Sequence, residues 1–235
     1  SAGLPTIPGS IELESAEDAR NQAKHLGYPV MIKARSGGGG RGIRLVTSEE
    51  EIENAFYSAQ AEGEAAFGDK AVYMEKYINP ARHVEVQIIA DEAGNVVCLG
   101  ERDCSIQKNN QKLIEESPSP AISQSARHVL FQQVSKAVKQ VGYCGVGTLE
   151  FLLEEKTGQW FFMEMNVRLQ VEHTVTESLT GIDLVKWQIR VASGINLNFT
   201  QDSVNTKGSA IECRIVATSP GTVKLLHIPG GPRVR

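Results

Sequence analysis

Residues 28–46 read YPVMIKARSGGGGRGIRLV, and the pattern of this stretch separates the possible folds. Apolar runs of strand type, residues 28–34 and 43–46, flank a run of glycines. Gly37, Gly39 and Gly42 match the GxGxxG pattern, but a dinucleotide-binding loop must lead into a helix, and here a strand follows. The loop also lacks the Gly-Lys-Ser/Thr ending of a P-loop. The stretch therefore predicts a glycine-rich hairpin, not either of those nucleotide-binding folds.

Two interpretations of the glycine run stay open from the residues alone. Glycine lets backbone N–H groups approach a phosphate closely, and Lys33 and Arg41 add positive charge beside them. This favours a lid that covers a phosphate. The loop of such a lid would consist of Gly37, Gly38, Gly39 and Gly40. A surface hairpin without a ligand fits the segment equally well.

Outside this hairpin, helical segments alternate with strands. Apolar residues at helical spacing predict helices near residues 15–27, 48–59, 123–141 and 176–193. Strand patterns cover residues 72–78, 83–90, 96–99, 146–153, 159–165 and 210–216. In the second of these, Val84, Val86 and Ile88 lie on one face, and His83, Glu85 and Gln87 lie on the other. The order indicates an α+β fold with an antiparallel sheet.

The composition is that of a globular protein, with 41% hydrophobic and 22% charged residues and a net charge of -4. The slight acidity argues against nucleic acid as a partner. No run approaches the roughly 20 apolar residues of a membrane-spanning helix, so we expect no membrane association. The four cysteines, Cys98, Cys104, Cys144 and Cys213, form no CxxC pair, which favours reduced thiols. We expect a cytoplasmic location, or a mitochondrial one in a eukaryote.

Two carboxylates stand in apolar strand segments, Glu150 within GTLEFLL and Glu164 within WFFMEMN. Burying a carboxylate is costly unless a cation or hydrogen bonds compensate it. A hairpin about the turn at residues 156–158 would bring Glu150 and Glu164 together, with Asn166 on the same face. Oxygen ligands of this kind suit Mg²⁺ or Mn²⁺. For either glutamate alone, a salt bridge or an exposed strand face is the simpler interpretation.

Polar side chains continue this second strand at every other position: Asn166, Arg168, Gln170 and Glu172. If the segment is extended, these four side chains point the same way. Arg168 would then hold an anion, Gln170 would offer its amide, and Glu172 could act as a base. A solvated edge strand is the alternative. His173, the next residue, could be structural or functional.

Several separated motifs, taken together, resemble one family. They are Ile32-Lys33-Ala34 with the glycine run, Met74-Glu75-Lys76-Tyr77, Arg82-His83-Val84-Glu85-Val86-Gln87, Glu101-Arg102-Asp103-Cys104-Ser105 and the stretch from Glu164 to His173. In order and spacing they resemble the biotin carboxylase component of acetyl-CoA, propionyl-CoA and pyruvate carboxylases, over nearly the whole chain. The resemblance implies an ATP-grasp fold, with a small glycine-lid subdomain over a larger antiparallel-sheet subdomain.

The resemblance also implies a domain plan. Residues 1–78 would form the ATP-grasp lid subdomain with the glycine-rich loop, residues 79–205 the catalytic subdomain, and residues 206–235 the start of the C-terminal domain. The family has a further N-terminal domain that completes the nucleotide site with another lysine. We therefore expect this chain to be a fragment that lacks that domain and most of the C-terminal domain.

Matching positions in the family imply the site residues. The nucleotide would be held by Lys33, Gly37, Gly38, Gly39, Gly40, Glu75, Lys76, Ile78, His83 and Gln107. The metal ligands would be Glu150 and Glu164, with Asn166 beside them. Bicarbonate would be bound by Lys112, Arg168, Gln170 and Val171, with Glu172 as the general base and Arg214 stabilising the enolate of biotin.

The implied reaction is the ATP-dependent carboxylation of biotin, the first half-reaction of a biotin-dependent acyl-CoA or pyruvate carboxylase. Glu172 would deprotonate bicarbonate, which attacks the γ-phosphate of ATP, with Mg²⁺ bound, to form carboxyphosphate. Carboxyphosphate would release CO₂ next to biotin. The partners would be ATP, bicarbonate, a biotin carrier protein and a carboxyltransferase, and members of this family are often homodimers.

Two features depart from the family pattern, and two other functions stay open. Asn109 and Asn110 stand where relatives usually carry Arg-His, and residues 214–221 form a stretch several residues shorter than usual. Another ATP-grasp ligase, such as a carbamoyl-phosphate synthetase, would share the lid, Glu150 and Glu164. A MgATP-binding module without catalysis is the alternative outside the enzymes.

Overall fold

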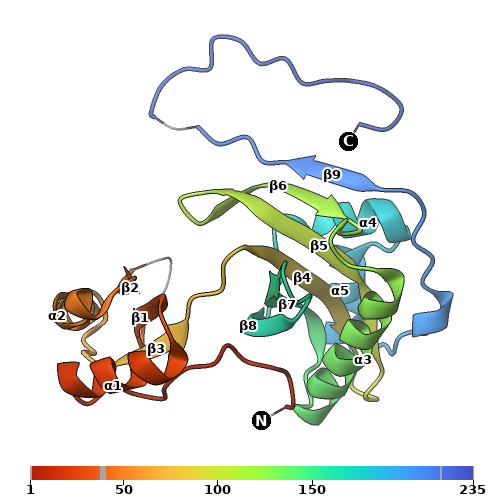
Figure 1. The fold of residues 1–235 in the computed structure, drawn as a ribbon. Coiled ribbons are helices and arrows are strands. Elements are labelled where there is room, and N and C mark those ends of the chain that lie inside the picture. The colour runs from red at the N-terminus through yellow and green to blue at the C-terminus, as the bar shows by residue number, and fades with distance from the viewer. Residues whose placement is uncertain (1, 38–40, 218, 235) are drawn as a thin grey trace.

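Two antiparallel sheets carry the fold, and the computed structural model describes residues 2–37, 41–217 and 219–234. The smaller sheet has the order β2-β1-β3, with β1 at Val30–Ala34, β2 at Ile43–Val46 and β3 at Val72–Lys76. Two helices pack on it: α1 at Ala16–Leu26, and α2 at Ile52–Phe67, which follows the 3-10 helix η1 at Glu49–Glu51. We call this part the lid subdomain; Figure 1 shows it in red and orange beside the larger sheet.

Sequence periodicity accounts for the lid subdomain. Along β1, Val30, Ile32 and Ala34 alternate inward and are buried against the two helices. Helix α1 begins after Ser15, whose Oγ accepts a hydrogen bond from the Asp18 backbone N–H at 3.1 Å. Each fully buried valine or isoleucine contributes about 1.5–3 kcal/mol. The lid subdomain therefore has an apolar cluster of its own.

The glycine-rich loop joins β1 to β2 as a hairpin, as the sequence predicts. Ala34 N donates to Gly42 O at 2.8 Å, and Gly37 N donates to Ala34 O at 3.0 Å. Gly42 has a φ of +71°, and a Cβ at this position would lie 2.6 Å from the Ala34 Cβ, so a side chain does not fit. Gly38, Gly39 and Gly40 lie outside the described residues, so only the two ends of the predicted lid loop are described.

The larger sheet has the order β8-β7-β4-β5-β6-β9, and its neighbouring strands are antiparallel. Its strands are β4 at Ala81–Ala90, β5 at Val96–Lys108, β6 at Gln111–Ser117, β7 at Gly145–Glu154, β8 at Trp160–Asn166 and β9 at Ala210–Cys213. Helix α3, Gln124–Gln140, covers one face; α4, His173–Thr180, and α5, Leu184–Ala192, lie on the other (Figure 1), and the 3-10 helix η2 spans Gln201–Ser203. The α+β class expected from the sequence is confirmed.

The two faces of the larger sheet differ in chemistry because side chains alternate along each strand. On β4, Val84, Val86 and Ile88 belong to the apolar cluster that packs with α3. Glu85 and Gln87 point to the opposite face, where both are fully buried. The division predicted for this strand is confirmed, and it places a stripe of polar side chains beside α4.

Two elements predicted from the sequence are wrong. Residues 176–193 form two helices, because Gly181 ends α4 in a left-handed conformation with a φ of +71° and Asp183 caps α5. Residues 167–172 do not extend β8: the strand ends at Asn166, and the chain turns before α4 begins. Of the alternate polar residues of that stretch, Arg168 is exposed, whereas Gln170 and Glu172 are buried.

The first residues of the chain connect the two sheets. Thr6 forms a β-bridge with Phe162 on β8, and Gly9 forms one with Glu75 on β3. The second connection follows β3 at residues 77–80. Residues 214–217 and 219–234 form neither helix nor strand and are drawn as the long loop at the top of Figure 1. The domain boundaries at residues 78 and 205 stay predictions.

No helix in the described part of the chain has the length and apolar character needed to cross a membrane. The longest helices, α2 and α3, are amphipathic and each packs one face on a sheet.

Candidate active site

The β5–β6 hairpin places a lysine at the centre of the polar face. Asn109 and Asn110 form its tip with φ of 53° and 61°, left-handed conformations that asparagine adopts more readily than most residues. Lys112 follows, and its Nζ lies 2.5 Å from Glu85 Oε2, 2.9 Å from Glu150 Oε1 and 2.8 Å from Glu172 Oε1. The two asparagines that depart from the family pattern thus shape the turn that leads into Lys112.

Lys112 is a half-buried cation shared by three carboxylates. Burial lowers the pKa of its amine, but Glu85 and Glu150 outweigh that effect and hold the pKa above its usual range. The amine is therefore charged at neutral pH. Glu85 also pairs with the buried Arg102 guanidinium, and these two cations still leave one of the three carboxylates without a matching charge, so the polar face has room for further positive charge.

Glu150 is the most heavily hydrogen-bonded carboxylate of this face. Its donors, besides Lys112, are Asn166 Nδ2 at 2.8 Å and Gln170 Nε2 at 2.8 Å, and His83 Nε2 lies 2.7 Å from its Oε2. Burial raises the pKa of Glu150, but His83 and Lys112 outweigh burial and lower it to about 2. The carboxylate is thus ionised at neutral pH.

Glu172 is placed to accept a proton. It lies in the turn before α4 and is buried, and its Oε1 accepts from Lys112 at 2.8 Å. Its Oε2 accepts no hydrogen bond from any described residue. A carboxylate with one oxygen anchored by a cation and the other unpaired has the geometry of a general base.

Glu164 and Asn166 complete the set that could hold a metal. Glu164 pairs in register with Glu150 across β7 and β8, as the hairpin pattern predicts, but its side chain is exposed. It makes no ion pair or side-chain hydrogen bond with a described residue. Asn166 donates from Nδ2 to Glu150, which leaves its Oδ1 unpaired among the described residues. Carboxylate and amide oxygens at facing positions fit Mg²⁺, and these residues stay the predicted ligands.

The predicted nucleotide residues line the lid subdomain and the start of the larger sheet. Lys33 Nζ forms an ion pair with Glu75 across β1 and β3. Lys76 Nζ donates to Gly27 O at 2.6 Å and to Tyr28 O at 3.2 Å. Ile78 lies partly buried in the connection after β3. These contacts hold the charged side chains of β3 against the strand and loop that precede the glycine run.

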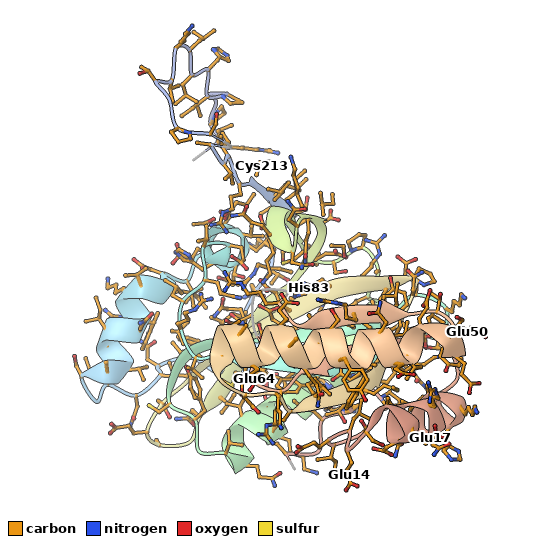
Figure 2. The ribbon with its side chains drawn as sticks, turned by 90° about the vertical axis from the view of Figure 1, so that its left-hand side faces the viewer. Glu14, Glu17, Glu50, Glu64, His83 and Cys213 are labelled. Carbon is orange, nitrogen blue, oxygen red and sulfur yellow. The ribbon has the colours of Figure 1, made fainter. Side chains whose placement is uncertain are left out.

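His83 lies where β4 begins, and Gln107 holds its ring. Gln107 Nε2 lies 2.8 Å from His83 Nδ1 and donates to Cys104 O at 2.8 Å. The other ring nitrogen, Nε2, forms the close contact with Glu150 described above but has no hydrogen bond with a described residue. Figure 2 labels His83 between α2, in front, and Cys213 on β9, while Glu14, Glu17, Glu50 and Glu64 are exposed on the outside of the lid subdomain.

Three predicted residues are not brought into this cluster. Arg168 is exposed, and its Nη1 donates to the neighbouring Leu169 O at 3.3 Å. Val171 is 54% exposed in the same turn. The side chain of Arg214 is exposed after β9, although its backbone N–H donates to Leu113 O, beside Lys112, at 2.8 Å. The expected alignment of Arg168 with Gln170 and Glu172 fails because residues 167–172 form a turn.

Sequence reasoning gave no role to two buried residues that organise the site. Arg102 is fully buried and donates to Glu85 Oε1 at 2.6 Å, and Glu85 in turn accepts from Lys112. Arg102 stood in a motif of the family resemblance, and Glu85 stood on the polar side of β4. The signal in the sequence was a charged residue within an apolar strand segment, because a charge buried there needs a partner.

Glu115 is a buried carboxyl behind this cluster, on β6. It pairs in register with Glu212 on β9, and its Oε2 has no hydrogen-bond partner among the described residues. Burial and the nearby Glu172 carboxylate raise the pKa of Glu115 to about 7. It is the one carboxyl of the polar face for which such a rise is resolved, and it titrates near neutral pH.

Residues 1–200 match the family described as the carbamoyl-phosphate synthase L chain, ATP-binding domain. The chain belongs to this ATP-binding domain family. Over its whole length this ATP-binding domain is also 53% identical to a biotin carboxylase of Nostoc, of which it covers 54%. The domain spans about half the length of the curated relatives it matches.

Solved structures resemble the ATP-binding domain closely. One is a biotin carboxylase complex with β,γ-ATP from Campylobacter jejuni, with a TM-score of 0.86 and 51% identity over 91% of this chain and 48% of that one. Another is the biotin carboxylase domain dimer of the Hydrogenobacter thermophilus 2-oxoglutarate carboxylase, with MgADP, ADP and bicarbonate. Its TM-score is 0.86 with 49% identity, over 91% of this chain and 47% of that one. The resemblance to biotin carboxylases and the ATP-grasp fold that it implied are confirmed.

Proposed function

We propose that this chain is the ATP-binding and carboxylating core of a biotin carboxylase. In the proposed reaction, bicarbonate and ATP give carboxyphosphate and ADP, and the carboxyl group then passes to biotin on a carrier protein. One observation carries the proposal: the half-buried Lys112 contacts both Glu150, a proposed metal ligand, and Glu172, the proposed base. The identity of 53% to a curated biotin carboxylase supports the same function.

Glu172 is suited to deprotonate bicarbonate. The Lys112 cation contacts this carboxylate and lies close to where the bicarbonate oxygen gains charge as its proton leaves. The deprotonated oxygen attacks the γ-phosphorus of ATP, and ADP departs with the electron pair of the broken P–O bond. The proton stays on Glu172. Gln170 and Arg168 are the proposed donors that hold the anion, Arg168 after its side chain turns inward, and Val171 the proposed backbone contact.

The carboxyl group then reaches biotin in two bond changes. The C–O bond of carboxyphosphate breaks to give CO₂ and phosphate, and the ureido nitrogen of biotin forms a C–N bond with CO₂ as it loses its proton to that phosphate. Arg214 is the proposed partner of the negative oxygen that biotin develops, since its backbone is bonded to Leu113, next to Lys112.

The nucleotide would lie between the lid subdomain and the polar face. Lys33 would exchange its Glu75 partner for phosphate oxygens, while Glu75, Lys76 and Ile78 hold the adenine and His83 and Gln107 lie near the ribose. Gly37 to Gly40 would cover the phosphates. Mg²⁺ held by Glu150, Glu164 and Asn166 would neutralise charge on the phosphate oxygens.

The proposed partners follow from the reaction. A biotin carrier protein brings the acceptor, and a carboxyltransferase uses the product; the parent protein is proposed to be a homodimer. We place it in the cytoplasm, because all four cysteines are free thiols and fit a reducing compartment. The three proposed domains, residues 1–78, 79–205 and 206–235, keep the boundaries expected from the sequence.

The test is turnover by the parent protein that contains this chain. ADP release should require bicarbonate, and free biotin should yield carboxybiotin. Glu172→Gln should bind MgATP as the wild type does but lose bicarbonate-dependent ADP release, because the amide cannot take a proton. Bicarbonate-independent ADP release without carboxybiotin would contradict the proposal, and full activity of Glu172→Gln would show that the base lies elsewhere.

A MgATP-binding module without catalysis is the second candidate. It is favoured by the positions of Arg168 and Arg214, whose guanidinium groups lie outside the Lys112 cluster. Calorimetry measures MgATP binding, and the turnover assay measures ADP release. Binding without ADP release at any bicarbonate concentration would support the module.

A further inference from the structure

We propose that Arg102 is a positioning residue that fixes the side-chain amide of Gln170, so that this amide offers N–H groups, not its oxygen, to bicarbonate. The proposal rests on the proposed function and deepens it. It gives a role to Arg102, which does not touch substrate. It also explains how the uncharged Gln170 side chain is held in the orientation that presents its N–H groups.

Arg102 uses every N–H group that it has. A guanidinium carries five such donors in a rigid fork. In addition to the Nε bond to Glu85, Nη1 donates to Gln87 Oε1 and Thr176 Oγ1, both at 2.8 Å, and Nη2 donates to Thr148 Oγ1 at 3.4 Å and Gln170 Oε1 at 3.2 Å. The five acceptors come from β4, β7, α4 and the turn before α4. Lysine, with three donors on a flexible stem, cannot reproduce this arrangement.

The amide of Gln170 is held at both ends. Its Oε1 accepts from Arg102, and its Nε2 donates to Glu150 Oε1 at 2.8 Å. A flipped amide would set N–H groups against the guanidinium N–H and the oxygen against the Glu150 carboxylate, so both contacts would become repulsive. In a buried site the loss of two hydrogen bonds to charged groups excludes that orientation.

One amide proton remains for a ligand. Nε2 carries two hydrogens, and one is used on Glu150. The second N–H has no acceptor among the described residues and projects from the same atom that lies within 2.8 Å of the carboxylate bound by Lys112. A free N–H close to an ammonium is a site for an anion oxygen. Arg102 therefore selects the donor face of Gln170.

The same guanidinium links the two donors that face bicarbonate. Glu85 accepts from Arg102 through Oε1 and from Lys112 through Oε2. The buried Arg102–Glu85 ion pair therefore positions both Gln170, through Arg102, and Lys112, through Glu85. Gln87 is itself held, because its Nε2 donates to Gly147 O at 2.9 Å, so the acceptors around Arg102 are not free to rotate away.

The experiment compares Arg102→Lys with Arg127→Lys in the parent protein. Arg127 is the matched control, because it also pairs with a buried glutamate, Glu101, but it belongs to α3, on the other side of the sheet from Gln170. Steady-state ADP release gives separate KM values for bicarbonate and for ATP. We expect Arg102→Lys to raise the bicarbonate KM about tenfold, the loss expected for one hydrogen bond to a charged partner, with the ATP KM nearly unchanged. Arg127→Lys should leave both KM values at the wild-type level.

Gln170→Glu provides a second measurement that does not depend on the folding of an Arg102 variant. A carboxylate still accepts from Arg102, but it has no N–H for bicarbonate and its second oxygen faces the Glu150 carboxylate, so the bicarbonate KM should rise at least as far as in Arg102→Lys. The double variant Arg102→Lys, Gln170→Glu should be no worse than Gln170→Glu alone, because both changes remove the same donor.

The outcomes are distinct. A purely structural role of Arg102 would lower the melting temperature and shift both KM values together or neither. A wild-type bicarbonate KM in Gln170→Glu, or in folded Arg102→Lys, would overturn this inference and leave the proposed function in place. A wild-type protein whose ADP release ignores bicarbonate would overturn both.

Discussion

Glu150 and Glu164 lie directly opposite each other in the β7–β8 ladder, yet the first carboxylate is buried and surrounded by donors and the second is exposed. The two proposed metal ligands therefore differ in what they contribute to the fold. Glu150 is held by His83, Lys112, Asn166 and Gln170 without any metal, whereas Glu164 depends on a ligand to be neutralised.

Replacing each glutamate by glutamine should separate metal binding from stability. We expect Glu164→Gln to change the free energy of unfolding by less than about 0.5 kcal/mol, as exposed substitutions do, but to raise the Mg²⁺ concentration needed for half-maximal ADP release. Glu150→Gln should cost about 1–3 kcal/mol, because buried donors lose a charged acceptor. Urea unfolding and a Mg²⁺ titration measure the two effects. The exposed Glu64→Gln is the control, and a wild-type Mg²⁺ requirement in Glu164→Gln would contradict the metal assignment.

Removing the shared cation should produce a pH-dependent loss of stability. Lys112→Met leaves Glu85, Glu150 and Glu172 without their ammonium, which should lower the free energy of unfolding at pH 8 by about 3–5 kcal/mol. The loss should be smaller at pH 5, where the unpaired carboxyls can take up protons. In the wild type the pKa of Lys112 is raised by folding, so the stability from this shift is complete below the unfolded pKa of the amine and is lost only as the pH rises above it. The difference between pH 5 and pH 8 therefore comes from the unpaired carboxyls of the variant. Exposed Lys70→Met is the control, and equal losses at both pH values would argue against the shared cation.

Glu115 should make the fold less stable as the pH rises. Its pKa is about 7 in the folded chain against an ordinary value of 4.5, so the unfolded chain ionises first. The stability from this difference is complete below pH 4.5 and is lost as the pH rises through 7, by at most about 3 kcal/mol at about 1.36 kcal/mol for each pKa unit. Glu115→Gln should therefore be more stable than the wild type at pH 8 and equal to it at pH 4. Melting curves at both pH values test this, with the neighbouring Glu116→Gln as control; a constant difference would refute it.

The turn before Lys112 should tolerate glycine but not a β-branched residue. Asn110 has a φ of 61°, and a β-branched side chain in this conformation should cost about 1–2 kcal/mol. We expect Asn110→Val to lose that amount in urea unfolding and to raise the bicarbonate KM, because the hairpin carries Lys112. Asn110→Gly should match the wild type in both. If Asn110→Val behaves as the wild type does, the turn does not position Lys112.

Local patterns predicted the parts of the fold that local physics controls. The hairpin about the glycine run, the two faces of β4 and the register that pairs Glu150 with Glu164 all follow from alternation along strands and from short turns. The break between α4 and α5 was missed because the apolar spacing runs through it, although Gly181 and Asp183 are a stop and a cap. The turn at residues 167–172 was missed because alternating polar residues are compatible with both a strand and a turn.

The organisation around Arg102 could not be read from spacing. Its partners lie 15 to 74 positions away along the chain, so their meeting depends on the strand order of the sheet and on where α4 packs. Strand patterns alone pointed to Glu150, Glu164, Asn166, Gln170 and Glu172, whereas Lys112, Val171 and Arg214 were named only by the resemblance to a family. For Arg168, Val171 and Arg214 that resemblance names a position whose side chain lies apart from the cluster.

The lid subdomain is joined to the rest of the molecule by two chain segments, one near Gly9 and one at residues 77–80. A rotation of the lid subdomain would therefore take place about the line through these two connections. Glu75, which forms a β-bridge with Gly9 at one of these connections, would move little in such a rotation. Ala34 lies four residues beyond Val30 along β1, which is about 13 Å from the Val30–Lys76 pair at about 3.3 Å per residue. It would therefore move further than Glu75. The adenine of a nucleotide would thus be held near Glu75 by a part of the lid subdomain that moves little, and its phosphates would lie near Ala34, at the part that moves most.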